Sequence, residues 1–191
     1  MAYLNQHPHQ FMPTPYTVRT VGETHEPVRS MGGLTLLPDM TLAEVEPANS
    51  ALLILPGGTS WDAAGNTAAA EKARAFVAAE VPVAAICGAT AGLARAGLLD
   101  ERRHTSNAAD YLRATGYAGV PHYVEAPVVR DAGIITAAST APVAFAVAIF
   151  EALNLYTLEV RAAWSGLFST GEARYYHALV SALGAPGSVS T

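Results

Sequence analysis

The stretch VPVAAICGATAGL at residues 81–93 decides the fold and points to a reactive site. Its first half is a continuous apolar run, typical of a strand covered on both faces, and its second half continues as a helix. Small residues, Ala85 and Ala89, lie two positions either side of Cys87, which is the spacing of a nucleophile elbow. We therefore expect Cys87 at a sharp, exposed turn between a strand and a helix.

This turn is also expected to make the sulfur reactive. The first turn of the following helix directs unpaired N–H groups and the positive end of its dipole at Cys87, which favours the thiolate over the thiol. The alternative is an inert core cysteine, because free cysteines are among the most buried residues. The elbow spacing favours the reactive interpretation.

Around this stretch, buried strands alternate with helices. The apolar run at 51–55 predicts a strand that ends at a Pro-Gly-Gly turn (56–58), and the alanine-rich segment 67–80 predicts an amphipathic helix. Asn107 is expected to cap a helix that runs to Thr115. The alternation predicts an α/β doubly wound sandwich, with a mostly parallel sheet, helices on both faces and ligand sites beyond the carboxyl ends of the strands. Further extended segments are expected at 17–21, 32–38, 104–106, 122–129 and 134–137, and further helices at 142–153, 157–167 and 171–183.

Length and composition limit what the chain can be. With 191 residues, we expect a single domain over 1–191 with a frayed tail at 184–191. Hydrophobic residues make up 51% and charged residues 14%, the profile of a compact globular protein. A net charge of −5 without a basic cluster argues against nucleic acid as a partner.

The single cysteine excludes an internal disulfide framework and, without a visible signal sequence, favours a cytoplasmic protein. The run 133–150 carries no charge and has the length of a membrane span, but Ser139, Thr140 and Pro142 interrupt it where a strand would end and a helix begin. No membrane association is therefore expected. No metal or cofactor is expected either, because the chain lacks zinc-ligand spacing, a phosphate loop and a dinucleotide fingerprint.

Three motifs occur in order along the chain: LPGG at 55–58, AICGAT at 85–90 and RHTSN at 103–107. They are flanked by SMGGLT at 30–35, IIT at 134–136 and APVAFA at 141–146. Together these motifs resemble the ThiJ/PfpI family of the class I glutamine amidotransferase-like superfamily, over nearly the whole chain. The resemblance implies a flavodoxin-like sandwich, a reactive elbow cysteine and, usually, a homodimer.

The chain departs from the family pattern in two places. Many members have a histidine directly after the nucleophile, where this chain has Gly88. In the branch that it resembles, a histidine at the position of His104 lies near the thiol, so His104 is the candidate proton-transfer partner; its alternative is an ordinary surface or sheet-end histidine. Members also open with a strand and a glutamate-bearing loop, which are not visible here. We therefore expect that Met1 lies inside a longer reading frame and that the first strand is missing.

Attack by Cys87 on a carbonyl would place negative charge on oxygen. The backbone N–H groups of Gly58 and Gly88 are the candidate donors to that oxyanion, because glycine lets the backbone approach a ligand closely. The glycine pair at 57–58 equally suits a turn with positive φ. Thr90 and Asn107 also suit capping or packing, and for Asp62 a helix cap or a solvated side chain is the favoured interpretation. The other candidate pocket residues are Gly57, Trp61, Asp62, Thr90 and Asn107.

From the elbow and the resemblance we expect a cysteine-dependent hydrolase or amidase, or an enzyme that processes small electrophiles such as aldehydes. It would form a Cys87 adduct with a small-molecule substrate, which water resolves while His104 moves the proton. The alternative is a non-catalytic redox-sensing or stress-response, chaperone-like protein that uses the same oxidisable cysteine. A glutamine amidotransferase-like transferase ranks last, because no His-x-Glu segment follows late in the chain.

Overall fold

The computed structural model describes residues 2–5 and 12–184, which fall into two compact units. The larger unit, Thr20–Ala148, contains the central sheet and Cys87, and the smaller unit joins Met1–Arg19 to Ile149–Thr191. The single domain expected from chain length stays a prediction. Of the tail expected to fray, only Gly184 is described, as the last residue of a helix, and 185–191 lie outside the described residues.

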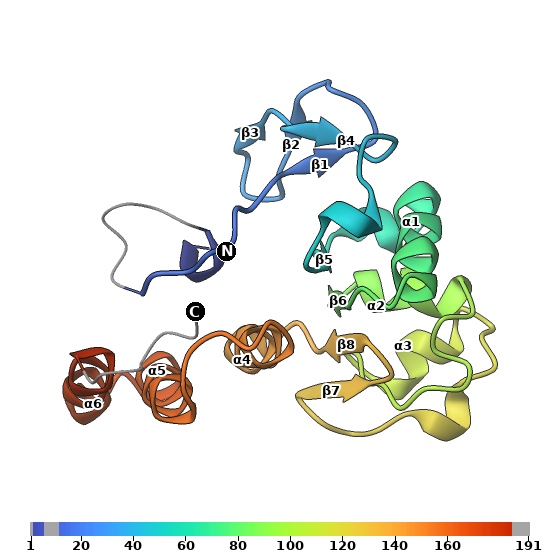
Figure 1. Cartoon of the computed structure of the whole chain (residues 1–191). Coiled ribbons are helices and arrows are strands. Elements are labelled where there is room, and N and C mark those ends of the chain that lie inside the picture. Colours follow the sequence, from blue (N-terminus) through green and yellow to red (C-terminus); the bar gives the residue numbers. More distant parts are fainter. Residues whose placement is uncertain (1, 6–11, 185–191) are drawn as a thin grey trace. The chain divides into compact units, whose positions relative to one another are not determined.

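A four-stranded, mostly parallel sheet forms the centre of the larger unit (Figure 1). Its order is β5 (Leu53–Leu55), β6 (Val83–Ile86), β8 (Ile134–Ala137) and β7 (Val128–Asp131), and β7 alone runs antiparallel, beside β8. The expected α/β, flavodoxin-like class is thereby confirmed. Because β5 and β6 are parallel neighbours, their carboxyl ends bring the glycine pair at 57–58 beside Cys87.

Helices α1 (Thr67–Ala78), α2 (Ala89–Arg95) and α3 (Ala109–Arg113) lie within the larger unit, where α1 comes after β5 and α2 after β6 along the chain. Phe76 of α1 and Leu93 of α2 are fully buried in one core cluster with Val83 of β6, which is why these apolar positions recur at helical spacing. The helices therefore fix β6 and the turn that follows it.

The charge-free run at 133–150 is divided between strand β8 and helix α4 (Pro142–Ala152), as the interrupting residues predict. Over the part of the chain that the structure describes, no helix has the length and apolar character needed to cross a membrane. The run 133–150 therefore contains a strand and the start of a helix, as expected.

The hairpin that contains β7 begins later than the sequence predicts. In place of a strand from residue 122, a short 3-10 helix, η4 (Val120–His122), precedes an irregular segment, and β7 starts at Val128. Tyr123 forms an isolated bridge with His104, and the N–H of Val124 donates to the His104 carbonyl oxygen at 2.8 Å. This segment therefore pairs with residue 104 instead of extending the hairpin.

The extended segments expected at 17–21 and 32–38 form only two-residue strands. A parallel pair joins β1 (Val21–Gly22) to β4 (Met40–Thr41). An antiparallel pair joins β2 (Val28–Arg29) to β3 (Thr35–Leu36). The remaining short elements are the 3-10 helices η1 (Ala2–Leu4), η2 (Pro47–Asn49) and η3 (Thr59–Trp61).

In the smaller unit, helices α5 (Leu158–Thr170) and α6 (Ala173–Gly184) pack against each other. Thr157 caps α5 by accepting the N–H of Val160, and Gly171, at φ 72°, ends it three residues later than expected. The buried Trp164 of α5 lies against Tyr3, Phe150 and Phe168. Both helices are confirmed, and an aromatic cluster holds their unit together.

Candidate active site

Cys87 forms the elbow that its neighbours predict. It lies between β6 and α2 with φ 58°, a left-handed conformation that costs a residue with a side chain about 1–3 kcal/mol. Hydrogen bonds hold this backbone on both sides: the Cys87 N–H donates to Ala137 O at 3.0 Å, and the Thr90 hydroxyl donates to Cys87 O at 2.7 Å. The strained turn is therefore fixed by the sheet and by the helix.

Close approach of the backbone explains the glycines around Cys87. A Cβ added at Gly57 would lie 2.6 Å from Cys87 Cβ and 3.3 Å from its Sγ. A Cβ added at Gly88 would lie 2.7 Å from Gly58 O. Since Gly58 is extended, at φ −178°, and Gly57 has no positive φ, the turn with positive φ that we considered for this pair is wrong.

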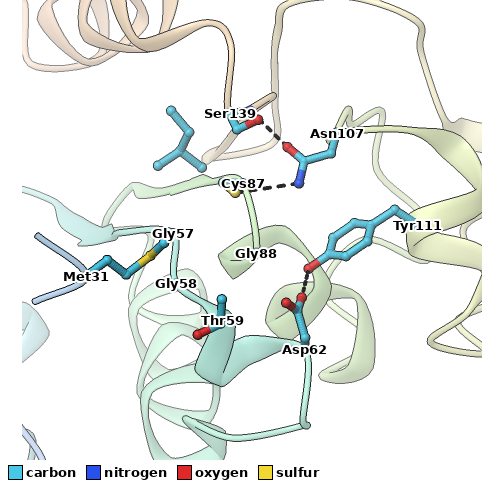
Figure 2. A pocket seen from close by; sticks show the side chains of 11 residues that line it. Met31, Gly57, Gly58, Thr59, Asp62, Cys87, Gly88, Asn107, Tyr111 and Ser139 are labelled. Atoms are coloured by element: carbon cyan, nitrogen blue, oxygen red, sulfur yellow. Dashed lines mark hydrogen bonds between the residues drawn. The ribbon is translucent and has the colours of Figure 1, made fainter.

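Half-buried Cys87 lines a cavity of about 370 Å³, which Figure 2 shows. Gly58 and Gly88 line it too, and their N–H groups have no hydrogen-bond acceptor among the described residues. Their expected role as donors to an oxyanion stays a prediction. The cavity is also lined by Met31, Gly57, Thr59, Asp62, Ile86, Asn107, Tyr111 and Ser139.

Asn107 connects the sulfur to the loop after β8. Its Nδ2 donates to Cys87 Sγ at 3.5 Å, while its Oδ1 accepts the Ser139 N–H at 2.9 Å (Figure 2). The expected helix cap is therefore wrong: Ala108 occupies the N-cap position of α3, and the Asn107 side chain is occupied elsewhere. The Asn107 amide therefore links the Cys87 sulfur to the backbone of the loop after β8.

Asp62 and Tyr111 form another wall of the pocket, where the Tyr111 hydroxyl donates to Asp62 Oδ1 at 2.6 Å (Figure 2). Burial, followed by this hydrogen bond to the carboxylate, raises the pKa of Tyr111 to about 12. Tyr111 therefore keeps its proton at neutral pH. Arg95 donates to the carbonyl oxygens of Trp61 (2.7 Å) and Asp62 (3.4 Å), which fixes the turn that carries Asp62.

The structure does not bring His104 into this pocket. His104 is fully buried, with Nδ1 2.7 Å from Arg102 O and Nε2 2.8 Å from the Tyr117 hydroxyl. Because a carbonyl only accepts, Nδ1 carries the proton and Nε2 accepts from Tyr117. Burial is the main cause that lowers the pKa of His104, so the ring is neutral at pH 7. Its role as a proton-transfer partner stays a prediction that this geometry does not support.

Two other predicted pocket residues lie behind the pocket wall. Trp61 is buried, donates from Nε1 to Pro56 O at 2.9 Å, and packs where a side chain at Gly92 would have to be. Thr90 is also buried, with its hydroxyl 2.6 Å from Ser106 Oγ. Both residues support the elbow and do not face the cavity.

The sequence reasoning missed Tyr111 and Ser139. A signal was available for Tyr111, which follows Asn107 by four residues, the spacing of neighbours on one helical face. Ser139 comes just after β8, which is a parallel neighbour of β6. Because the carboxyl ends of parallel neighbours meet at one sheet edge, the position of Ser139 near Cys87 could also have been predicted. No group of three or more metal-ligating side chains gathers among the described residues.

The chain is similar to known proteins over most of its length. The sequence model of the DJ-1/PfpI family matches residues 8–152. The chain belongs to the DJ-1/PfpI family. It is 34% identical over 168 residues to a protein named uncharacterized protease YoaZ from Bacillus subtilis (strain 168), covering 87% of this chain and 80% of that one.

Solved structures of this family have the same fold. The chain superposes on a ThiJ/PfpI family protein from Bacillus anthracis with a TM-score of 0.82 and 34% identity, over 99% of this chain and 85% of that one. A DJ-1 superfamily protein from Agrobacterium tumefaciens gives a TM-score of 0.75 and 33% identity, over 82% of this chain and 84% of that one. The family resemblance predicted from the motifs is confirmed.

Proposed function

We propose that this DJ-1/PfpI protein is a cysteine-dependent enzyme that acts on small carbonyl compounds through a covalent Cys87 adduct. The observation that carries the proposal is the strained elbow: Cys87 lines the cavity with an amide donor at its sulfur, and Gly58 and Gly88 line the same cavity. A relative named as an uncharacterized protease supports hydrolase-type chemistry at the level of the family.

In the proposed reaction, the Cys87 thiolate attacks the carbonyl carbon, and the carbonyl electron pair moves onto oxygen. The N–H groups of Gly58 and Gly88 stabilise that oxyanion, and one such donor contributes about 3 kcal/mol to a transition state. Asn107 Nδ2 stabilises the thiolate before the attack. With an aldehyde, the oxyanion takes a proton from water to give a hemithioacetal. Where the aldehyde carries a second carbonyl group on the neighbouring carbon, transfer of the C1 proton to C2 converts this adduct to a thioester, which water hydrolyses to a 2-hydroxy acid and the free thiol.

The pocket favours an aldehyde over an amide. Hydrolysis of an amide needs an acid to protonate the departing amine, and no imidazole lines the cavity among the described residues. Addition to an aldehyde expels no leaving group. A cavity of about 370 Å³ also suits a small substrate, since it lies near the lower limit of ligand pockets.

The proposal is tested with Cys87→Ser and Cys87→Ala variants on aldehyde, amide and peptide substrates. Both variants should lose turnover by at least about 100-fold, because the nucleophile is removed. Glu71→Gln, an exposed change on α1, is the matched control and should keep full activity. Undiminished turnover in Cys87→Ala would reject the mechanism.

A second candidate, a redox sensor, rests on the same donors. Asn107 and the two glycine N–H groups would also stabilise the oxygens of an oxidised Cys87 sulfur. Peroxide titration with mass spectrometry of the Cys87 peptide separates the two: oxidation at low peroxide without turnover of any carbonyl substrate favours the sensor. The glutamine amidotransferase-like alternative, the homodimer and the cytoplasmic location stay predictions.

A further inference from the structure

Asp62 is the only carboxylate among the described residues that line the Cys87 pocket, and none of these residues carries a cationic side chain. Asp62 is exposed on its pocket wall, and its Oδ1 accepts the Tyr111 hydroxyl. A ligand bound at the sulfur therefore meets one fixed negative charge and no positive one.

The nearest cation does not neutralise this carboxylate by a direct ion pair. Arg95 directs its guanidinium to the backbone carbonyl oxygens of Trp61 and Asp62 instead of to the Asp62 side chain. Tyr111, the hydrogen-bond partner of the carboxylate, is a neutral phenol. Asp62 therefore has a second carboxylate oxygen, Oδ2, for which the described residues provide no partner.

The pKa of Tyr111 agrees with this placement of charge. Besides burial and the hydrogen bond, the charges of Asp62 and Cys87 raise the pKa of Tyr111, and Arg95 lowers it.

We infer that Asp62 sets the substrate class of this pocket: small neutral or positively charged carbonyl compounds that carry a hydroxyl or amino group, with carboxylates disfavoured. A hydroxyl or ammonium donates to the free carboxylate oxygen while the carbonyl carbon lies at Cys87 Sγ, and an anionic substrate is repelled. The identity of the reacting group rests on the proposed function, whereas the charge preference does not.

The charge preference is measurable without turnover, because Cys87 is the only cysteine of the chain. Three methanethiosulfonates of similar size serve as probes: the aminoethyl (cationic), methyl (neutral) and sulfonatoethyl (anionic) reagents. Each transfers its thioalkyl group to the Cys87 thiolate as a disulfide and releases methanesulfinate. Wild-type protein should react faster with the cation than with the anion, and salt should reduce this ratio.

Asp62→Asn keeps an acceptor for the Tyr111 hydroxyl and removes the charge. It should lower the cation-to-anion rate ratio by about fivefold, the effect of one unit charge in a partly solvated site. Tyr111→Phe keeps the carboxylate and should preserve the preference for the cation. Glu71→Gln, an acidic residue outside the pocket, should leave the ratio at its wild-type value. An unchanged ratio in Asp62→Asn overturns the inference.

Reversible adducts of matched carbonyl probes then connect charge to substrate class, because a hemithioacetal at Cys87 protects the sulfur from alkylation. Glycolaldehyde, which carries a hydroxyl, should protect Cys87 at a lower concentration than propanal, and glyoxylate, which carries a carboxylate, should require the highest concentration; Asp62→Asn should reduce the differences between the three probes. Equal protection by glycolaldehyde and glyoxylate in the wild type contradicts the inferred class. A shifted labelling ratio with no protection by any aldehyde supports the charge preference and refutes the proposed function.

Discussion

Asn107 holds two partners with one side chain, and each partner uses a different atom of the amide. The Nδ2 end supports the Cys87 sulfur, and the Oδ1 end anchors the Ser139 backbone. A substitution that alters only the contact with Cys87, and keeps the contact with Ser139, therefore tests the effect of Asn107 on the reactivity of the thiol.

Asn107→Asp keeps an oxygen for the Ser139 N–H but puts a carboxylate oxygen at the sulfur. We expect iodoacetamide to alkylate Cys87 about tenfold more slowly at pH 7.5, because the thiolate loses a donor and gains a like charge. The measurement is the second-order rate by intact-protein mass spectrometry. Ser139→Ala is the control, since it keeps the backbone N–H and should react at the wild-type rate.

If Asn107→Asp is alkylated as fast as the wild type, the contact at 3.5 Å does not control the thiol. An Asn107→Ala variant gives a second reading, because it removes both contacts without adding charge. A normal rate in both variants excludes Asn107 from the activation of Cys87.

At the scale of elements, the segment 103–107 explains why Asn107, and not His104, contacts Cys87 in the structure. In an extended segment successive side chains alternate between two faces, so His104 and Asn107 point in opposite directions. Asn107 faces the sulfur, and His104 consequently faces Tyr117 and Tyr123. The family motif identified the right segment, and the alternation along it decides which residue reaches the pocket.

Buried hydrogen bonds hold this segment in place. Thr105 N donates to Thr136 Oγ1 at 2.9 Å, the Thr105 hydroxyl donates to Ala126 O at 2.7 Å, and Ser106 shares a hydrogen bond with Thr90. Burial of these polar side chains is not costly, because each of them has a hydrogen-bond partner. The segment is therefore a rigid support that ends in the Asn107 amide.

Protonation of His104 should weaken this support. Its pKa is lowered in the folded protein and near 6.5 when unfolded, so the unfolded chain takes up the proton more readily. The stability contributed by the neutral ring is complete above about pH 6.5 and falls as the pH drops toward the folded-state pKa. Between pH 7.5 and 5.5, His104→Gln should lose less stability than the wild type in urea unfolding.

His177→Gln is the control for this experiment, because its ring is exposed on α6 in the folded protein. It should lose stability with pH as the wild type does. An equal loss in His104→Gln and wild type refutes the burial argument. The same His104 variant, assayed with carbonyl substrates at pH 7.5, also tests the predicted proton-transfer role, which requires a loss of turnover in a folded protein.

The long elements were predictable because burial leaves a periodic signal. The apolar run of β6 and the amphipathic pattern of α1 appear in the sequence much as they do in the structure. The two-residue strands and the late start of β7 depend on pairing with distant segments, which no local pattern records. The same holds for the site. Cys87 could be predicted from the residues next to it in the sequence, whereas Ser139 lies near Cys87 because β8 pairs with β6 in the sheet.

At the scale of the whole molecule, the chain forms two compact units, and the smaller one combines both ends of the sequence. Chain length alone predicts one domain, whose parts would unfold in one cooperative step. The compactness of each unit does not decide whether the two units unfold in one step or separately. An unfolding experiment that follows each unit is needed to distinguish these cases.

The two tryptophans provide the means to answer it. Trp61 lies in the larger unit and Trp164 in the smaller, and both indoles are buried, at 4% and 5% exposure. Trp61→Phe and Trp164→Phe each leave one intrinsic fluorophore, whose emission should shift to the red when its own unit exposes it to water. Coincident urea midpoints for far-UV circular dichroism and emission within each variant would establish a single domain, whereas an emission midpoint displaced from the dichroism curve would reveal independent melting.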